Sequence, residues 1–290
     1  MNILVTGSNG QLGSEINDLA EYYPNFNFFF TDLSELDICN RRQLNIFIKE
    51  NNINTVINCA AYTAVDKAEQ DEDIAKKVNS TAVLNLVNAL EKENGKLIHI
   101  STDYVFDGNN FMPYHELDDV NPIGVYGNSK RSGELEVINS DIDAIVIRTS
   151  WLYSAYGNNF VKTMLRLGNE RDELRVIFDQ VGSPTNALDL AKTCLDILSY
   201  SKDTNINCKG NLYHFSNEGV ASWYDFSIAI MTLGKVSCSV KPIETKDYPT
   251  PAKRPHFSVL NKSKIKNDFK IDIPYWRDSL AKCILKLKNN

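Results

Sequence analysis

The chain opens with an alternation of short apolar runs and longer amphipathic stretches. Residues 3–5 are typical of a buried strand, and the apolar positions from Leu12 to Tyr23 fall on one helical face. Further strands are predicted at 26–31, 55–59, 97–100 and 144–147, with helices between them, for instance at 41–50 and 71–90. Strands that alternate with helices form right-handed βαβ units, with helices on both faces of a parallel sheet. The pattern therefore predicts a doubly wound α/β fold.

After about residue 150 the alternation becomes less regular. We expect a helix at 159–167, a strand at 174–178 and a helix at 187–198, and from Cys208 onward short strands and helices mix with prolines. This change in the pattern predicts that the chain folds into two structural parts. Residues 1–150 with about 185–200 would form the doubly wound domain, and about 151–184 with 201–290 a smaller mixed α/β lobe that closes over a substrate.

Composition narrows the possible partners. The 290 residues carry a formal net charge of −6, whereas binding to nucleic acid needs a basic face. The apolar runs are far shorter than the ~20 residues of a membrane span, and the N-terminus runs into glycines without the basic region of a signal peptide. The six cysteines are scattered without a Cys-x-x-Cys pair, which indicates reduced thiols. We expect a cytoplasmic protein that binds neither nucleic acid nor membranes.

A glycine-rich segment follows the first predicted strand and opens the first helix. Gly7, Gly10 and Gly13 have the spacing that allows a tight turn, close approach of the backbone to a pyrophosphate, and close packing of helix on strand. The pyrophosphate would bind to free N–H groups at the helix N-terminus. In this strand–turn–helix context the segment predicts a Rossmann dinucleotide site.

An acidic residue ends the second predicted strand. Asp32 stands nineteen residues after Gly13, where a carboxylate accepts hydrogen bonds from the adenosine ribose hydroxyls and repels a 2′-phosphate. The alternative is a turn or cap residue. We expect both NADH and NADPH to work, with NADH favoured.

The catalytic candidates follow the fourth strand and begin a later helix. Tyr126 and Lys130 share a helix face at positions i and i+4, so the phenol and the ammonium can reach one site. The cation is expected to lower the pKa of the tyrosine, which would donate a proton to a carbonyl oxygen as hydride arrives at the carbon. Thr102 could share the hydrogen bond to that oxygen, and Lys130 would also bind the nicotinamide ribose. The alternative for this pair is an exposed helix start.

These segments together resemble the extended short-chain dehydrogenases/reductases, and within them the dTDP-4-dehydrorhamnose reductases. The resemblance covers nearly the whole chain, through the segments at 7–13, 59–69, 101–108, 126–130, 148–151, 157–160, 179–185 and 253–258. It implies reduction of the C4 ketone of dTDP-4-dehydro-L-rhamnose to dTDP-L-rhamnose, the last step in making this cell-wall sugar donor.

The resemblance also assigns residues to two groups. Cofactor contacts would come from Gly10, Gln11, Leu12, Asp37, Ile38, Ala61, Tyr62, Thr63, Tyr126 and Lys130. Sugar contacts would come from Thr102, Asp103, Tyr126 and Trp151, with Val65 and Asp66 nearby and Arg254 toward the diphosphate. Asp37 has the alternative of a helix cap, Trp151 that of a core aromatic, and Arg254 that of a solvated surface residue.

The sequence departs from the resembling family at the residues of a metal site. Some family members are described as dimers bridged by Mg²⁺ through glutamates, and Glu15 matches one such position, but Leu188 stands at the second and an acid follows only at Asp189. A shift of one residue turns a helical side chain by about 100°. We therefore expect no metal site, leave monomer and homodimer open, and interpret the four histidines as structural.

Two alternatives remain. A 4,6-dehydratase or 4-epimerase of the same superfamily is the nearest, but the dehydratase pattern has a glutamate after Thr-Asp where this chain has Tyr104. A phenol does not replace a carboxylate there at neutral pH. The other is a non-catalytic binding subunit, similar to the regulatory subunit of methionine adenosyltransferase, for which degraded catalytic residues would be expected.

Overall fold

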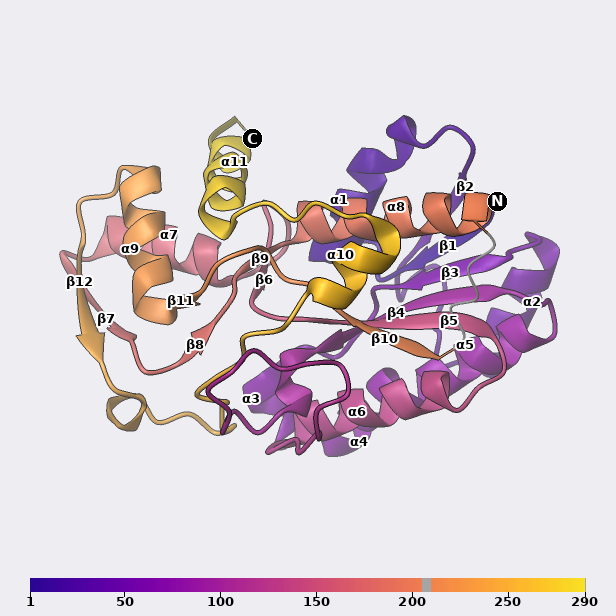
Figure 1. Cartoon of the computed structure of the whole chain (residues 1–290), viewed down its shortest axis with the longest axis horizontal. Helices are drawn as coiled ribbons and strands as arrows, with labels where there is room; N and C mark the ends of the chain where they lie inside the picture. The colour runs from indigo at the N-terminus through magenta and orange to yellow at the C-terminus, as the bar shows by residue number, and fades with distance from the viewer. Residues whose placement is uncertain (205–209, 290) are drawn as a thin grey trace.

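A six-stranded parallel sheet forms the larger part of the molecule (Figure 1). The computed structural model describes residues 1–204 and 210–289. The strands lie in the order β10-β5-β4-β3-β1-β2 and are β1 (Asn2–Thr6), β2 (Asn27–Thr31), β3 (Thr55–Asn58), β4 (Lys96–Thr102), β5 (Asp143–Thr149) and β10 (Asn211–His214). The first five confirm the strands predicted from the apolar runs. The strand order changes direction between β1 and β3, and ligands of open α/β sheets bind beyond the carboxyl ends of the strands at such a point.

Helices cover both faces of this sheet because successive strand residues point to opposite sides. Ile3 and Val5 face α1 (Gln11–Leu19), α8 (Ala187–Thr204) and α10 (Ser263–Phe269). Leu4, between them, faces α2 (Arg41–Glu50), α5 (Ala82–Glu91) and α6 (Val125–Ile138). Two buried apolar layers result, and the predicted doubly wound fold is confirmed.

The helix expected at 71–90 is interrupted. After the short α3 (Val65–Ala68), the chain forms α4 (Glu72–Lys76), a π-helical turn η2 (Lys77–Thr81) and then α5. The turn places the buried Asn79 side chain against the loop after β3. Its oxygen accepts from the Tyr62 N–H at 2.8 Å, and its nitrogen donates to the Tyr62 carbonyl at 3.1 Å and to Ser129 Oγ at 3.0 Å. Such turns are frequent at functional sites, and here the turn fixes a loop that lines the cavity described below.

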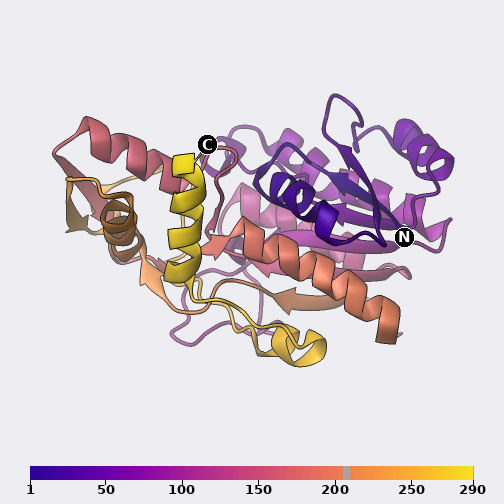
Figure 2. The same ribbon diagram turned by 90° about the horizontal axis from the view of Figure 1, so that it is seen from above.

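The smaller lobe packs three helices around short strand pairs. The parallel pair β7 (Glu173–Ile177) and β12 (Ser239–Ile243) lies beside α7 (Phe160–Glu170) and α9 (Trp223–Gly234). The pairs β6 (Leu152–Tyr153) with β9 (Thr185–Asn186) and β8 (Val181–Gly182) with β11 (Ala221–Ser222) complete it, together with α11 (Trp276–Asn289). In Figures 1 and 2, α11 stands between the other lobe helices, α7 and α9, and the large sheet. Short 3-10 turns lie at η1 (Ala20–Tyr22), η3 (Asp103–Val105) and η4 (Thr245–Asp247).

One strand of the large sheet falls in the range that we expected for the lobe. Strand β10 pairs with β5, and Ile265 and Phe269 of α10 belong to the apolar layer that α1 and α8 also form. The chain therefore returns to the sheet after residue 210, and the division into two domains remains a proposal.

Two expectations from composition concern the whole chain. Among the described residues, no helix is long and apolar enough to cross a membrane. Cys39, Cys59, Cys194, Cys238 and Cys283 are free thiols, and Cys208 lies outside the described residues.

Candidate active site

The glycine-rich turn has the geometry that a bound pyrophosphate requires. Gly7 has a φ of +62°, and a Cβ there would stand 2.8 Å from the Ala60 backbone. A Cβ on Gly13 would stand 2.5 Å from the Gly7 carbonyl oxygen, so this glycine allows α1 to pack on the turn. Gly10 is the N-cap of α1 and brings no side chain to cap the helix. The N–H groups of the first helical turn are thus available to an anion.

A cavity of about 910 Å³ opens above this turn, at the carboxyl ends of the parallel strands. Most of the predicted site residues line it, namely Gly7, Gly10, Gln11, Leu12, Asp32, Asp37, Ile38, Ala61, Tyr62, Thr63, Val65, Thr102, Asp103, Tyr126, Lys130 and Trp151. Three predicted site residues are not among those that line it: Gly13, Asp66 and Arg254. The structure therefore brings most of the sequence-predicted cofactor and sugar residues to one cavity.

Asp32 lies at the edge of the cavity and also holds the glycine turn. Its Oδ2 accepts from the Asn9 N–H at 3.0 Å, and its Oδ1 accepts from the Leu33 N–H at 2.7 Å. Both the ribose role and the turn role that the sequence left open are thus compatible with its position. Asp37 is not the cap of α2, because Asn40 caps that helix through a bond from the Gln43 N–H.

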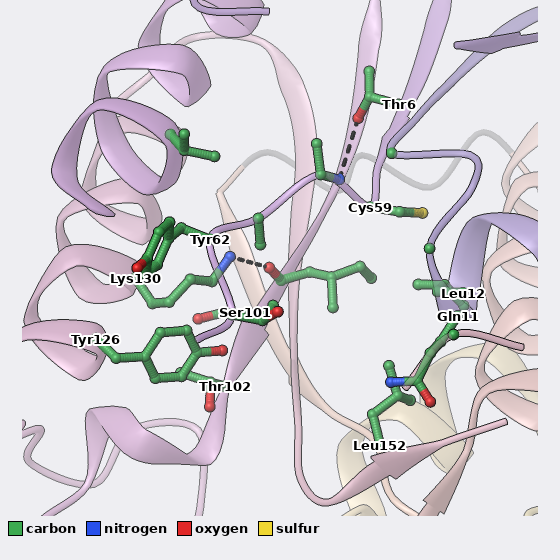
Figure 3. A pocket seen from close by; sticks show the side chains of 18 of the residues that line it. Thr6, Gln11, Leu12, Cys59, Tyr62, Ser101, Thr102, Tyr126, Lys130 and Leu152 are labelled. Carbon is green, nitrogen blue, oxygen red and sulfur yellow. Dashed lines mark hydrogen bonds between the residues drawn. The ribbon is translucent and has the colours of Figure 1, made fainter. Parts of the chain in front are cut away.

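Tyr126 and Lys130 project from α6 into one side of the cavity, opposite Gln11 and Leu152 (Figure 3). The Lys130 Nζ donates to the Ile100 carbonyl oxygen at 2.6 Å, at the end of β4. Thr102, two residues further on, lines the same side of the cavity beside the Tyr126 phenol (Figure 3). The phenol, the hydroxyl and the ammonium therefore meet where β4 ends, and the pair is not an exposed helix start.

The pKa of Tyr126 differs from our expectation. Burial raises it to about 12, and the neighbouring Thr102 hydroxyl offsets this only in part. The expected lowering by Lys130 is wrong for this structure, because the ammonium donates to a backbone carbonyl instead. Burial lowers the pKa of Lys130 to about 8, although the Glu134 carboxylate nearby opposes the shift. At neutral pH the phenol keeps its proton and the lysine is largely charged.

Asp103 is a buried carboxyl group beside these residues. Its Oδ1 accepts from the Thr102 hydroxyl at 3.1 Å. Burial raises its pKa to about 7, more than the hydrogen bonds from Ser258 and Thr102 lower it. This group can therefore either accept or donate a hydrogen bond near neutral pH.

Arg254, expected at the diphosphate, and Asp66, expected near the sugar, form an ion pair outside the cavity lining. The Arg254 Nη2 lies 2.7 Å from Asp66 Oδ2, and Asp66 also accepts from the Ala252 N–H at 3.2 Å. These contacts and the nearby Tyr104 raise the pKa of Arg254, although burial acts to lower it. Arg254 is thus engaged within the protein and is not a purely solvated residue.

Trp151 forms one wall of the cavity next to the lobe. Its ring stacks on that of Trp223, with centroids 3.6 Å apart and planes inclined by 7°. Its backbone has a φ of +49°, and a Cβ on Gly182 would stand 2.7 Å from the indole. One face of the ring is therefore supported by the lobe, while the residue is only partly buried.

Sequence reasoning missed several residues that line the cavity. Ile74 and Val78 face it from α4 and η2, where the pattern predicted a continuous helix. Thr149 ends β5 and Ser150 follows it, so the expectation that ligands bind at the carboxyl ends of the strands, which was applied to β4, would also have found these two residues. Asn159, in the loop before α7, carries no signal of its own beyond its place in a resembling segment.

The residues aligned with a metal site do not fit a bridging Mg²⁺. The Glu15 carboxylate accepts from Ser154 Oγ at 2.6 Å and from Lys286 Nζ at 2.8 Å. Asp189 accepts instead from Asn217 and Ser279, at another place. Within residues 1–204 and 210–289, no group of three or more acidic, histidine or cysteine side chains is placed to hold a metal ion. Glu15 already has a cation, so no metal enters the chemistry derived below.

Comparison with known proteins agrees with this architecture. The family model described as "RmlD substrate binding domain" matches residues 1–289. A dTDP-4-dehydrorhamnose reductase of Aggregatibacter actinomycetemcomitans is 41% identical over 96% of both chains. The crystal structure of a dTDP-4-dehydrorhamnose reductase from Clostridium acetobutylicum is 42% identical with a TM-score of 0.93, over 99% of this chain and all of that one. One from Bacillus anthracis, in complex with NADP, is 36% identical with a TM-score of 0.91, over 98% of this chain and 99% of that one.

The fold and the arrangement of the cavity define a Rossmann-type protein of the short-chain dehydrogenase/reductase superfamily. Within that superfamily, the chain belongs to the dTDP-4-dehydrorhamnose reductase family.

Proposed function

We propose that this protein reduces the C4 ketone of dTDP-4-dehydro-L-rhamnose to dTDP-L-rhamnose with NADH or NADPH. One observation carries the proposal: the glycine turn and the Tyr126–Lys130–Thr102 group open into the same cavity. A dinucleotide on the turn would extend toward the end of β4, where a proton donor is in place. The names of relatives that match the chain over nearly its full length support the same substrate.

The residues around the turn fit the dinucleotide. The N–H groups at the start of α1 would bind its pyrophosphate, and Asp32 would bind the adenosine ribose. Asp37, Ile38 and the loop from Ala61 to Thr63 would border the rest of it. When bound, the nicotinamide supplies the hydride that reduces the ketone. The NADP complex of the Bacillus anthracis relative supports this use of the cavity.

Tyr126 would supply the proton. Its raised pKa keeps the phenol protonated at neutral pH, and the oxygen formed at C4 as hydride arrives is far more basic than a phenolate. The proton therefore moves from the phenol to the sugar oxygen. Thr102 lies beside the phenol and its hydroxyl would share the bond to that oxygen, which stabilises the charge that develops there.

Lys130 would position the cofactor. Its ammonium is held by the Ile100 carbonyl and is directed into the cavity (Figure 3). The remaining donors of the ammonium would bind the nicotinamide ribose.

The sugar would lie between the end of β4 and the lobe. Asp103 offers a carboxyl group that can accept or donate, Trp151 offers a flat apolar face, and Val65 lies at the opposite wall. Arg254 would bind the diphosphate only by sharing its guanidinium with Asp66. This requirement makes Arg254 a weaker determinant of binding than Trp151.

The two alternatives lack support at the same positions. Dehydration needs an acid–base pair, but Tyr104 is a buried phenol whose pKa is well above its usual range, mainly through burial. Its ring packs edge-on against Tyr126, with centroids 5.5 Å apart. A non-catalytic subunit would not need to keep Thr102, Tyr126 and Lys130 in one cluster. We further propose that the protein works in the cytoplasm as a monomer or homodimer, without nucleic acid.

The experiment is an absorbance assay at 340 nm with NADH and with NADPH, and with a panel of 4-keto nucleotide sugars that differ in base and in hexose. Oxidation of the cofactor on adding dTDP-4-dehydro-L-rhamnose is expected, and NMR of the product should give the rhamno configuration at C4. No oxidation with any 4-keto sugar would favour a binding subunit, and turnover of the 4-hydroxy nucleotide sugar alone would favour an epimerase or dehydratase.

A further inference from the structure

A buried carboxylate on the cofactor helix is neutralised from the far end of the chain. Glu15 is 2% exposed and lies one turn after Gln11 on α1. Its Oε1 accepts from Ser154 Oγ, and its Oε2 from the Nζ of Lys286 on α11. A buried carboxylate is costly unless it is paired and hydrogen-bonded. Ser154 and Lys286 together meet that requirement.

Lys286 makes further contacts that hold it in this place. Its Nζ lies 2.7 Å from Asp18 Oδ2 and 4.5 Å from the centre of the Tyr156 ring. The Tyr156 hydroxyl donates to the same Asp18 oxygen at 2.8 Å. Burial acts to lower the pKa of Lys286, but the hydrogen bonds and charges of Asp18 and Glu15 raise it overall, so the ammonium persists. The pair is thus a fixed ionic contact between α11 and α1.

The segment joined to this contact lines the dinucleotide cavity. Ser154 Oγ also accepts from the Tyr156 N–H at 3.0 Å. The Asn159 side chain donates to Gln11 Oε1 at 3.0 Å and to the Ser154 carbonyl at 2.7 Å. Residues 157–159 and Gln11 are themselves cavity residues. Residues 154–159 are therefore tied to α1 at two points one turn apart, one at the cavity and one at Glu15.

We propose that Lys286 is a positioning residue for the dinucleotide. It holds α1 and residues 154–159 in the arrangement that forms one side of the cavity, and it supplies the cation that Glu15 requires. Divalent metal is then unnecessary for dinucleotide binding, since a metal at Glu15 would have to displace the ammonium. The inference rests on the proposed function only in that the dinucleotide occupies this cavity.

The test measures the Kd for NADPH and for NADH by fluorescence titration of the wild-type protein and of variants. Lys286→Met leaves Glu15 without its cation and is expected to weaken binding about tenfold. Lys282→Met changes an exposed lysine on the same helix and should leave Kd unchanged. Glu15→Gln combined with Lys286→Met removes both charges, and it should bind more tightly than Lys286→Met alone because no uncompensated charge stays buried.

A variant with a smaller change keeps the inference testable if Lys286→Met fails to fold. Ser154→Ala keeps both charges and removes only the hydroxyl that ties residues 154–159 to Glu15, so a weakening of roughly threefold is expected, on the scale of one neutral hydrogen bond. Equal Kd values for wild type, Ser154→Ala and folded Lys286→Met would overturn the inference. So would a loss of wild-type affinity on adding EDTA. A wild type that binds neither dinucleotide would instead overturn the proposed function.

Discussion

The two sides of the cavity are built in different ways. On the cofactor side, Gly7 to Gly13 lie in one strand–turn–helix unit, and Tyr126 and Lys130 lie one helical turn apart. On the lobe side, Arg254 meets Asp66 across 188 residues of sequence, and Trp151, between β5 and β6, meets Trp223 at the start of α9. The first side is fixed by local geometry, whereas the second depends on the packing of the whole lobe.

This difference indicates which side carries which property. Local units such as those of the cofactor side recur in many proteins of this fold and bind the cofactor that these proteins share. Substrate specificity belongs to the particular site grafted on the fold. Substitutions on the cofactor side should therefore change turnover or cofactor use. Substitutions of Trp151 and Arg254 on the lobe side should change recognition of the sugar and leave cofactor binding intact.

The largest effect is expected for Tyr126→Phe. Without the phenolic proton, kcat should fall by roughly 10² or more, the usual scale of lost acid catalysis. The Kd for the dinucleotide, measured by fluorescence titration, should stay close to that of wild type because the ring is kept. A variant that turns over at nearly the wild-type rate would remove Tyr126 from the mechanism.

Trp151→Ala tests the lobe side. The KM for the keto-sugar should rise about tenfold, which corresponds to about 1.4 kcal/mol for a lost aromatic contact. The KM for the dinucleotide should stay unchanged, and the free energy of unfolding should fall only modestly. Trp276→Ala, which truncates a buried tryptophan of the lobe, should instead lose about 3–5 kcal/mol of stability. If Trp151→Ala loses as much, Trp151 is a core residue.

A pH profile tests Lys130 on the cofactor side. Because burial lowers its pKa to about 8, the ammonium is present below that pH and is lost above it. The kcat/KM for the dinucleotide should therefore fall by roughly tenfold between pH 7 and pH 9, since kcat/KM reports ionisations of the free enzyme. The Lys130→Met variant should have a low kcat/KM for the dinucleotide, but this value should not decline further between pH 7 and pH 9. A decline that persists in Lys130→Met would assign it to another group.

The smallest effect is expected for Asp32→Ala, in the ratio of kcat/KM for NADH to that for NADPH. Two negative groups close together in a partly solvated site cost on the order of 1 kcal/mol, so wild type should favour NADH roughly fivefold and the variant should narrow or reverse the ratio. The loss of the bond to the Asn9 N–H should weaken both cofactors equally. A wild type that prefers NADPH tenfold or more would mean that Asp32 binds only the turn.

The sequence could predict the cofactor side because its signals are local. A run of apolar residues followed by Gly7, Gly10 and Gly13 specifies a strand, a turn and a helix start within one short stretch. The spacing from Tyr126 to Lys130 places both on one helix face. The sheet, the layers on its two faces and most of the cavity lining follow from such patterns.

The remaining features depend on tertiary context. The π-helical turn at η2 falls inside a stretch whose apolar pattern predicted one continuous helix, and the contacts of Asn79 that accompany it are tertiary. The pKa of Tyr126 depends on how deeply the phenol is buried and on where the Lys130 ammonium points, neither of which spacing determines. The contact of Lys286 with Glu15 joins residues 271 positions apart and carries no signal in either segment.

The most direct test of C4-ketone reduction follows the hydride from the cofactor to the product. The protein is incubated with dTDP-4-dehydro-L-rhamnose and with NADH or NADPH carrying deuterium at the transferred position, and the product is examined by NMR. We expect one deuterium, bound at C4 of dTDP-L-rhamnose. In Tyr126→Phe, the rate of deuteride transfer should be lower by a factor of roughly 10² or more. A product without deuterium, or with deuterium at another carbon, would contradict direct reduction of the C4 ketone in this cavity.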